Sequence, residues 1–378
     1  MRLGPNQSLL GQPQSLAKLQ TPALILDLDA FERNLRKMAE FAAAAPIAIR
    51  PHTKTHKSVR IASLQQAAGA AGVCCTTLGE AEVMVAGGVR AVLITSPVVG
   101  AAKIARLMEL LRSAPELRVV VDLPDNATAL AAAAAHAGLT LDVLVDVDLG
   151  RHRTGAATPA DTLSLAGQIA ASPHLRYRGV QAYAGHIQHV YGWTERQQAH
   201  LVTHECLSEH CRALRQAGLP PEVVTGGGTG SFLIDTERKL FNELQPGSYL
   251  FMDVDYNKVD APASAPRFET SLFVLSSVVS ANHAGLATID AGIKCLATDG
   301  LPPQPAGDLP AGTVYTFAGD EHGILKLGDP AARLKVGDHV RCITSHCDPT
   351  VNLHDRYHCY RGDRLVEMWP IDGRGKSL

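Results

Sequence analysis

Two lysines and two histidines stand close together in the run RPHTKTHK at residues 50–57: His52, Lys54, His56 and Lys57. The run follows a short apolar stretch, which places it at the end of a strand or in the loop after one. On an extended chain, side chains alternate between two faces, so Lys54 would share its face with both histidines and Lys57 would lie on the opposite face. A lysine that points into an α/β interior is costly unless it is paired or acts as a desolvated amine. Lys54 is therefore a candidate nucleophile, and a solvated basic loop is the alternative.

Two further polar runs come directly after apolar strands. The run DVDLGRHRTG ends at residue 155 and contains Arg153, which could hold an anionic oxygen; a surface arginine is the alternative. The run QAYAGHIQH begins at residue 181 and contains an aromatic residue and two imidazoles. Tyr183 could stack on a ligand or hydrogen-bond to it, or belong to the core, and His186 and His189 are candidate bases.

Glycine-rich turns follow the late strands. The run TGGGTGS occupies residues 225–231 and includes Gly228 and Thr229, and the run QPGS occupies residues 245–248. Bare backbone N–H groups in such loops can converge on a phosphate. The first loop lacks the lysine of a P-loop, so a nucleoside triphosphate is not expected. One glycine-rich loop is weak evidence, and two in succession strengthen the case for an anion site.

The run TSHCDPT at residues 344–350 is a candidate metal site. On an extended segment, His346 and Asp348 project to one face and Cys347 to the other. An imidazole and a carboxylate, with water completing the coordination shell, suit Mn²⁺ or Mg²⁺. A turn at the end of a strand, without a metal, is the alternative.

The elements that must position these residues alternate regularly along the chain. From residue 21 onward, short apolar strands and amphipathic helices follow one another until about residue 252. About eight strands in this order favour a closed (β/α)₈ barrel of the TIM type over an open doubly wound sheet. No GxGxxG run follows the first strand, as a dinucleotide-binding sheet would require.

The texture of the sequence changes near residue 258. A Pro/Ala/Ser-rich linker, Asp260–Arg267, precedes short β-rich runs broken by glycine and proline. Helical patterns are nearly absent there, which indicates a second, mostly antiparallel β domain. We therefore expect a barrel at residues 29–260, and a β domain made of residues 1–28 and 261–378 that carries the candidate metal pair.

Composition limits the classes of partner. The chain has 378 residues, of which 46% are hydrophobic and 19% charged, with a formal net charge of -2. Such a balance gives no basic field for nucleic acid or a membrane surface. No secretory h-region and no apolar run of membrane-spanning length occur, and the eight cysteines form no CxxC pair. We expect a reduced, cytoplasmic protein without nucleic-acid or membrane partners.

Taken together, the motifs resemble those of one family. The order TPALILDLDAF, RPHTKTHKS, GVCC, QAYAGHIQH, TGGGTGS, NELQPGSYLFMDVDY, SHCDPTVNLHD and WPI extends over nearly the whole chain. The chain resembles D-threonine aldolases and 3-hydroxy-D-aspartate aldolases, which belong to the alanine-racemase-like, fold-type III enzymes that use pyridoxal 5′-phosphate (PLP).

The resemblance implies a role for each motif. Lys54 would bind PLP covalently, Arg153 would lie near its phenolic oxygen, and Tyr183 would contact it. The glycine loops would surround its phosphate and pyridine edge through Gly228, Thr229, Gly247 and Ser248, with Gln245 near the ring nitrogen. His346 and Asp348 would hold Mn²⁺ or Mg²⁺, and His189 would stand beside the substrate hydroxyl. Thr76 stands where the aldolases often have glutamine, so no cofactor contact is assigned to it, and His186 occupies a position that varies in the family.

The implied activity is cleavage of the Cα–Cβ bond of a small β-hydroxy-D-amino acid, D-threonine or 3-hydroxy-D-aspartate, to glycine and an aldehyde. A PLP-dependent dehydratase acting on D-serine or 3-hydroxyaspartate is the nearest alternative, but that branch typically has H-x-C and zinc where this chain has His346 and Asp348. A PLP-binding protein without turnover and a PLP-independent metal hydrolase are the others. The resemblance also implies a homodimer. Roles for His52, His56 and His186 stay open.

Overall fold

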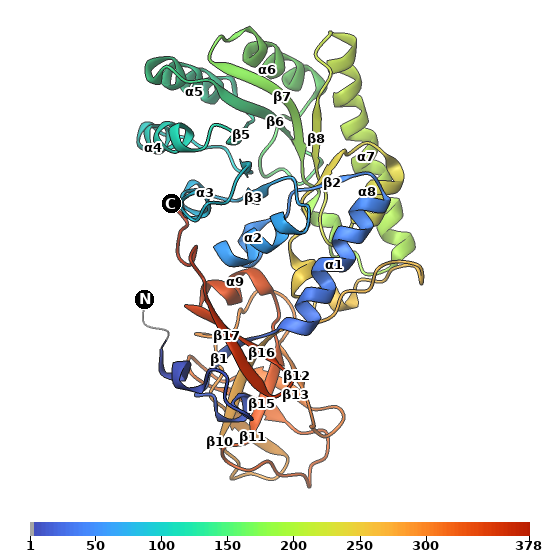
Figure 1. Cartoon of the computed structure of the whole chain (residues 1–378). Coiled ribbons are helices and arrows are strands. Elements are labelled where there is room, and N and C mark those ends of the chain that lie inside the picture. The colour runs from blue at the N-terminus through green and yellow to red at the C-terminus, as the bar shows by residue number, and fades with distance from the viewer. Residues whose placement is uncertain (1–3) are drawn as a thin grey trace.

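Short strands that alternate with helices form the upper half of the molecule in Figure 1. The computed structural model describes residues 4–378; residues 1–3, the start of the segment expected to join the β domain, lie outside the described residues. The strands of this half are β2 (Ala48–Ile49), β3 (Val73–Cys75), β4 (Val92–Ile94), β5 (Arg118–Val121), β6 (Leu141–Val147), β7 (Leu175–Ala182), β8 (Val223–Gly226) and β9 (Glu243–Leu244).

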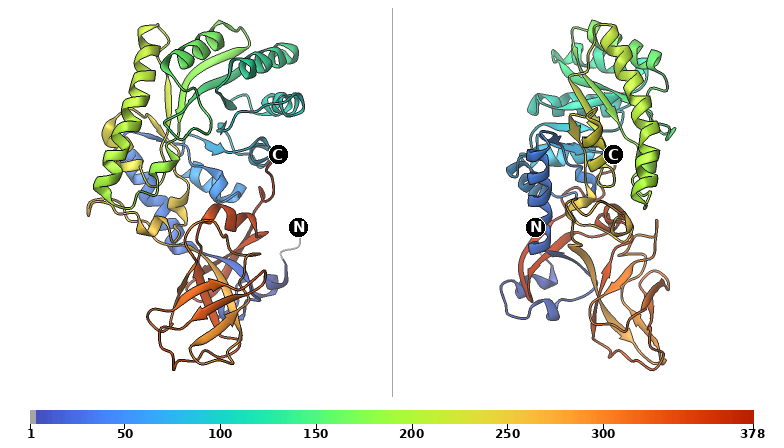
Figure 2. Two further views of the ribbon diagram at one scale, coloured as in Figure 1. Left: turned by 180° about the vertical axis from the view of Figure 1, so that it is seen from behind. Right: turned by 90° about the vertical axis from the view of Figure 1, so that its right-hand side faces the viewer.

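Helices surround these strands on the outside (Figures 1 and 2). They are α1 (Leu28–Ala44), α2 (Val59–Ala67), α3 (Leu78–Ala86), α4 (Ala101–Ser113), α5 (Pro124–Ala137), α6 (Pro159–Ala171), α7 (Trp193–Gln216) and the short α8 (Phe232–Arg238). Polar residues start several of them: the side chains of Asp27, Thr77 and Thr158 accept N–H groups in the first turns of α1, α3 and α6. Such caps satisfy donors that have no partner within the helix.

The eight strands are parallel and form a barrel. Their order in the sheet is β2-β9-β8-β7-β6-β5-β4-β3. The two ends of this series meet where His52 bridges Cys74 in parallel, and the N–H of Cys74 donates to the carbonyl of Pro51 at 2.8 Å. The predicted (β/α)₈ barrel is confirmed. All eight strands thus end at one rim of the barrel, which is where such barrels build their sites.

The lower half is a second sheet of mostly antiparallel strands (Figure 1). It contains β1 (Ala23–Asp27), β10 (Leu272–Ser280), β11 (Leu286–Ile289), β12 (Gln304–Ala306), β13 (Val314–Phe317), β14 (Gly323–Lys326), β15 (His339–Ile343), β16 (Arg356–Arg361) and β17 (Arg364–Pro370). The first strand, β1, pairs antiparallel with β10 and parallel with β16, so the N-terminal strand joins this sheet as expected.

Several short elements were not predicted. The helix α8 follows the glycine loop directly, and the strands β12 and β16 have no clear signal in the sequence. A short helix, α9 (Cys347–Asn352), breaks the expected all-β pattern of the second half and lies at the boundary with the barrel (Figure 1). The segment before β1 contains two 3₁₀ turns, Pro5–Leu9 and Leu16–Lys18, and buries Leu19.

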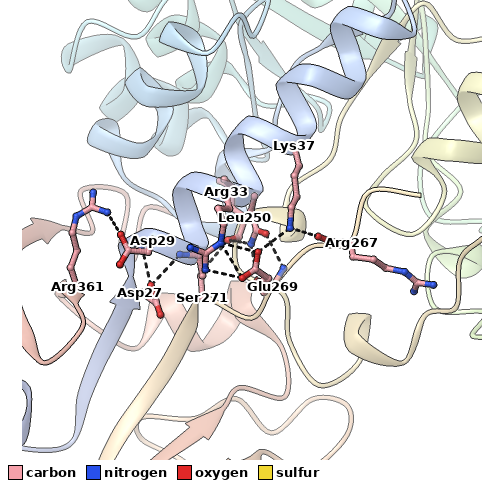
Figure 3. A network of polar contacts seen from close by, with 11 residues as sticks. Asp27, Asp29, Arg33, Lys37, Leu250, Arg267, Glu269, Ser271 and Arg361 are labelled. Atoms are coloured by element: carbon pink, nitrogen blue, oxygen red, sulfur yellow. Dashed lines mark hydrogen bonds and ion pairs between the residues drawn. The ribbon is translucent and has the colours of Figure 1, made fainter. Parts of the chain in front are cut away.

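A polar network joins the first barrel helix to the segment that leads into β10 (Figure 3). Arg33 on α1 forms a two-pronged ion pair with Glu269, with the closest nitrogen–oxygen distance at 2.8 Å. Lys37, one turn later, bonds to the same carboxylate at 2.9 Å and to the carbonyl of Arg267 at 2.7 Å. Because these partners come from both halves of the chain, the network fixes the barrel against the second sheet.

The C-terminal segment returns from β17 to the barrel and ends beside α3 (Figure 2). There the N–H of Gly79 donates to the carbonyl of Leu378 at 2.8 Å. No helix within residues 4–378 has both the length and the apolar character needed to cross a membrane.

Candidate active site

A cavity of about 330 Å³ opens at the rim where the barrel strands end. Every residue to which the resemblance gives a role, except Asp348, lines this cavity, and Asp348 contacts Lys54 at its wall. These lining residues are Lys54, Arg153, Tyr183, His189, Gly228, Thr229, Gln245, Gly247, Ser248 and His346. A second cavity of about 240 Å³ lies between α1 and α2, but its lining contains no charged residue.

Lys54 lies in a 3₁₀ turn, Thr53–Thr55, and not on a strand. The expectation of alternating faces along residues 52–57 is therefore wrong. The side chain of His52 accepts the N–H of Lys54, and the carbonyl of Thr53 accepts the N–H groups of His56 and Lys57 at 3.0 and 2.6 Å, so the chain coils instead of extending. This turn buries Thr53 and directs Lys54 into the cavity.

Lys57 and His56 point away from the cavity for reasons that the sequence did not reveal. The ammonium of Lys57 forms an ion pair with the buried carboxylate of Glu80. The ring of His56 lies 3.2 Å from the side-chain oxygen of Gln65, and burial lowers its pKa to about 3. His52 lines the cavity, with its Nε2 atom 3.1 Å from the hydroxyl of Thr95.

The amine of Lys54 forms an ion pair with the carboxylate of Asp348. Burial is the largest single influence and disfavours the charged amine, but the charge and hydrogen bond of Asp348 together with other nearby groups raise the pKa of Lys54 overall. Burial would raise the pKa of Asp348, yet the charges of Lys54 and His346 lower it overall. The carboxylate is therefore ionised at neutral pH and available to a cation.

The predicted metal pair stands at the start of α9, because Cys347 begins a helix and does not continue a strand as expected. The Nε2 atom of His346 lies 3.9 Å from Oδ2 of Asp348, so the two side chains still converge. Cys347 is fully buried, with its sulfur 3.5 Å from the carbonyl of Met252. The thiol therefore faces the core, as expected, and not the cavity.

The donor atoms at this place suit a hard divalent ion. Oδ1 of Asp348 is buried and has no hydrogen-bond partner among residues 4–378, as a waiting ligand atom would be. The Nδ1 atom of His346 lies 2.8 Å from a carboxylate oxygen of Asp299, which leaves Nε2 on the side of Asp348. Within the described part of the chain, no group of three or more His, Cys, Asp or Glu gathers as for a metal. An ion here would take two protein ligands and fill its shell with water or substrate.

The two glycine turns leave backbone donors open on the cavity wall. The N–H groups of Thr229, Gly247 and Ser248 make no hydrogen bond within residues 4–378, and all three residues line the cavity. The hydroxyl of Thr229 accepts the N–H of Tyr249 at 3.0 Å and so joins the two turns. Three open amides on adjoining turns fit a phosphate group.

The wall beside these turns contains polar side chains that the sequence analysis did not single out. Gln181, on β7, donates to the carbonyl of Thr95 at 3.0 Å and to Asp146 at 3.0 Å. The side-chain oxygen of Gln181 accepts a hydrogen bond from the side-chain N–H of Gln245, which fixes the orientation of the Gln245 side chain. Burial raises the pKa of Asp146 to about 6. Only their positions at strand ends could have signalled Gln181 and Thr95 in advance.

Two arginines flank the tyrosine of the cavity. The guanidinium of Arg153 lies 5.8 Å from the ring centre of Tyr183, within reach of a cation–π contact. Arg151, which was not predicted, also lines the cavity. Thr76 lines it too, and its buried hydroxyl has no partner in the described chain.

His189 faces the cavity with its other side fixed. Its Nδ1 atom lies 2.8 Å from a carboxylate oxygen of Asp255, and its ring centre lies 4.5 Å from that of Tyr256. Burial is the main influence on the ring and lowers the pKa of His189, so the ring is neutral at pH 7 and can accept a proton. His186, the other candidate base, is exposed and does not line the cavity.

Barrel, lysine turn and glycine turns together define a class of protein, and comparison with known families names it. The alanine racemase N-terminal domain family matches residues 26–255, and a putative serine dehydratase domain matches residues 271–360. The chain belongs to the alanine racemase N-terminal domain family.

Individual relatives make the similarity more specific. The chain is 40% identical to the 3-hydroxy-D-aspartate aldolase of Paracoccus denitrificans (strain Pd 1222), over 96% of this chain and 94% of that protein. The crystal structure of D-threonine aldolase from Filomicrobium marinum superposes with a TM-score of 0.92 at 42% identity, covering 96% of this chain and 97% of that one. The D-threo-3-hydroxyaspartate dehydratase of Delftia sp. (strain HT23) is 30% identical over 94% of this chain and 98% of that protein. The predicted resemblance to the aldolases is confirmed.

Proposed function

We propose that this protein is a PLP- and divalent-metal-dependent aldolase that cleaves β-hydroxy-D-amino acids of the D-threonine or 3-hydroxy-D-aspartate type to glycine and an aldehyde. One observation carries the proposal: Lys54 stands in a single cavity between open backbone amides suited to a phosphate and the pair His346–Asp348 suited to a metal. The 40% identity to a 3-hydroxy-D-aspartate aldolase supports the same reaction.

The roles follow the two halves of the chain. We assign cofactor binding to the barrel, residues 29–260, and the metal pair to a β domain of residues 1–28 and 261–378. Membership of the barrel strands and of the second sheet supports this division. Lys54 would bind PLP through its amine, while Thr229, Gly247 and Ser248 hold the phosphate and Gly228 lines the wall beside it. Arg153, Tyr183 and Gln245 would position the ring.

The residues present suit cleavage of a bond between Cα and Cβ. PLP, when bound, supplies an electron sink for the carbon that keeps the amino group. A divalent ion beside His346 and Asp348 would lower the pKa of the β-hydroxyl of the substrate. His189 would take the proton of that hydroxyl on Nε2, because its Nδ1 atom faces Asp255. The partial burial of the cavity keeps bulk water from competing for these groups.

The same scaffold also serves elimination in the related dehydratase. In an elimination the bond between Cβ and the hydroxyl oxygen breaks and the hydroxyl leaves the substrate. In an aldol cleavage the hydroxyl stays on Cβ and loses its proton, and the Cα–Cβ bond breaks. In this chain the second metal-ligand position holds a carboxylate, Asp348, and the neighbouring thiol of Cys347 is buried away from it. Oxygen ligands favour Mn²⁺ or Mg²⁺, and a thiolate would favour zinc.

The deciding experiment measures products. Purified protein with PLP is given D-threonine, 3-hydroxy-D-aspartate and D-serine, first with EDTA and then with Mn²⁺ or Mg²⁺ restored. We expect glycine and an aldehyde from at least one of the first two substrates, with loss in EDTA and recovery with the metal. Formation of ammonia and pyruvate from D-serine, without glycine from the other two substrates, would show that the protein is a dehydratase and not an aldolase.

A labelling experiment tests the lysine. Borohydride reduction should fix the PLP label on Lys54, and Lys54→Ala should lose both the label and turnover. Lys57→Ala is the matched control from the same run, and should keep the label because Lys57 pairs with Glu80 outside the cavity. A label that survives in Lys54→Ala contradicts the assignment.

We also propose a cytoplasmic homodimer. All eight cysteines are free, which supports a reducing compartment. Sedimentation of the holoenzyme would test the dimer.

A further inference from the structure

The glycine loop at residues 225–231 rests on four polar side chains that are nearly inaccessible to solvent. Gln188 follows β7, His200 belongs to α7, and Ser231 and Asp235 stand at the loop end and on α8. Each exposes 2% of its surface or less. We call Gln188, His200, Ser231 and Asp235 the support array. The reaction proposed above uses none of these side chains, although burying them carries a cost that needs compensation.

Hydrogen bonds connect the array from the helix to the loop. His200 Nε2 lies 2.5 Å from one oxygen of Asp235, and the hydroxyl of Ser231 donates to the other at 2.6 Å. With its proton so directed, the Ser231 oxygen accepts the side-chain N–H of Gln188 at 2.9 Å and the backbone N–H of Gly228 at 3.2 Å. The Gln188 oxygen accepts the N–H of Gly230 at 3.0 Å.

The array thereby decides which loop amides face the cavity. The N–H groups of Gly228 and Gly230 turn inward to the array, and that of Thr229, between them, stays open on the cavity wall. The N–H groups of successive peptides in this loop point in alternate directions. Hydrogen bonds to the inward-pointing N–H groups therefore keep the N–H group between them directed at the cavity. Without the array, Gly228 and Gly230 would be free to turn their donors toward the ligand or away from it.

Close packing of the array also accounts for glycines that a phosphate alone would not require. A methyl group added at Gly228 would lie 2.5 Å from the side-chain oxygen of Gln188. Methyl groups at Gly227 and Gly230 would also collide, with Asp235 and with the backbone of Gln188. The loop therefore touches the array so closely that a shift in one moves the other.

We propose that His200 and Asp235 are positioning residues that hold the glycine loop in the shape that binds a phosphate dianion. They act through Ser231 and Gln188 and do not touch the ligand. The choice of PLP as the ligand rests on the proposed function, but the positioning of the amides does not depend on the reaction that follows. Loss of His200 leaves an oxygen of Asp235 buried without a hydrogen-bond partner, which is unfavourable. Asp235 would then shift, and its hydrogen bond to Ser231 would carry that shift to the glycine loop.

The test compares two ligands that differ only in the phosphate. PLP and pyridoxal are titrated into the apoprotein, and the ratio of their dissociation constants reports the phosphate site alone. We expect His200→Leu to raise the PLP constant on the order of tenfold, while the pyridoxal constant changes less than about threefold. His210→Leu is the matched control: His210 lies on the same helix, is equally buried, and bonds to Thr162 at 2.7 Å, away from the loop.

The outcomes separate this proposal from the proposed function. Equal weakening of both ligands by His200→Leu, or the same change in the ratio with His210→Leu, would overturn the positioning role. If His200→Leu does not fold, Ser231→Ala serves instead and must lower the preference for PLP. A wild-type protein with no preference for PLP over pyridoxal would also overturn it. A protein that shows the expected ratios but makes no glycine would refute only the aldolase reaction.

Discussion

A single methyl group added at Gly247 should displace the turn that carries Lys54 and so lower the activity. Gly247 stands in the turn before Tyr249 and packs directly against the turn that carries Lys54. A Cβ atom there would lie less than 3.0 Å from the side-chain oxygen of Thr55. Cβ atoms in real structures essentially never come that close to another atom. The backbone of Gly247 has a φ of -121°, which lies outside the left-handed region that favours glycine. Gly247→Ala therefore places its methyl group against the side chain of Thr55, and saturating PLP keeps the phosphate site beside Gly247 filled.

The size of the effect follows from the displacement. Restoring ordinary carbon–oxygen contact requires the two turns to separate by roughly 1 Å. A shift of that size at a reacting group costs on the order of 100-fold in rate, and overpacking costs about 1–3 kcal/mol of stability. We expect Gly247→Ala to lower kcat for glycine release by about that factor, measured with PLP and Mn²⁺ at saturation. Thermal unfolding of the same samples would report the stability.

A second substitution isolates the cause. Thr55→Ala removes the hydroxyl that the methyl group would meet, so the double variant should recover most of the rate lost by Gly247→Ala. Gly167→Ala is the control for added methyl groups, because Gly167 on α6 has no neighbouring atom within 4 Å of an added Cβ. The reasoning is refuted if Gly247→Ala keeps the wild-type kcat, or if the double variant is as slow as the single one.

Three further predictions concern charge and protonation. Glu243→Gln should cost about 3–5 kcal/mol in urea unfolding, because it leaves the buried guanidinium of Arg50 without its two-pronged partner; replacing both residues with apolar ones should cost less. Burial lowers the pKa of His56 in the folded protein to about 3, whereas the histidine of the unfolded chain titrates near 6.5. Below about pH 6.5 the unfolded chain therefore binds a proton at this position and the folded protein does not, so the free energy of unfolding falls as the pH drops. At pH 5 this loss is about 2 kcal/mol, and His56→Gln should flatten that part of the pH profile. Asp299→Asn should weaken Mn²⁺ binding about 10- to 100-fold in equilibrium dialysis, since Asp299 orients His346; unchanged affinity would count against the metal site.

The barrel could be predicted because its helices are long enough to show a period and because short apolar runs recur between them in a fixed order. The 13 residues of helix α4, Ala101–Ser113, bury one face at helical spacing. The glycine turns and the lysine run could be placed at the rim because parallel strands all end there. Predictions of this kind depend only on local pattern and chain order.

The errors fall where tertiary contacts decide the backbone. Residues 53–55 coil because the His52 side chain accepts the N–H of Lys54 and because Thr53 bonds to the carbonyl of Cys74 at 3.0 Å. The segment after His346 becomes α9, and its six residues, Cys347–Asn352, are too few to show a helical period in the sequence. Support residues such as His200 and Asp235 lie 35 positions apart, and no spacing in the sequence indicates that they meet.

The lysine turn is fixed from the second half of the chain as much as from the barrel. The hydroxyl of Tyr357, on β16, donates to the carbonyl of His56 at 2.6 Å, and the N–H of Gly373 donates to the carbonyl of Lys57 at 2.8 Å. The carboxylate of Asp348 reaches Lys54 itself from α9. A barrel without residues 261–378 would lose all three contacts while keeping its strands. Barrel folds usually position catalytic groups through their own loops, but in this protein the position of the key amine is shared between the two halves.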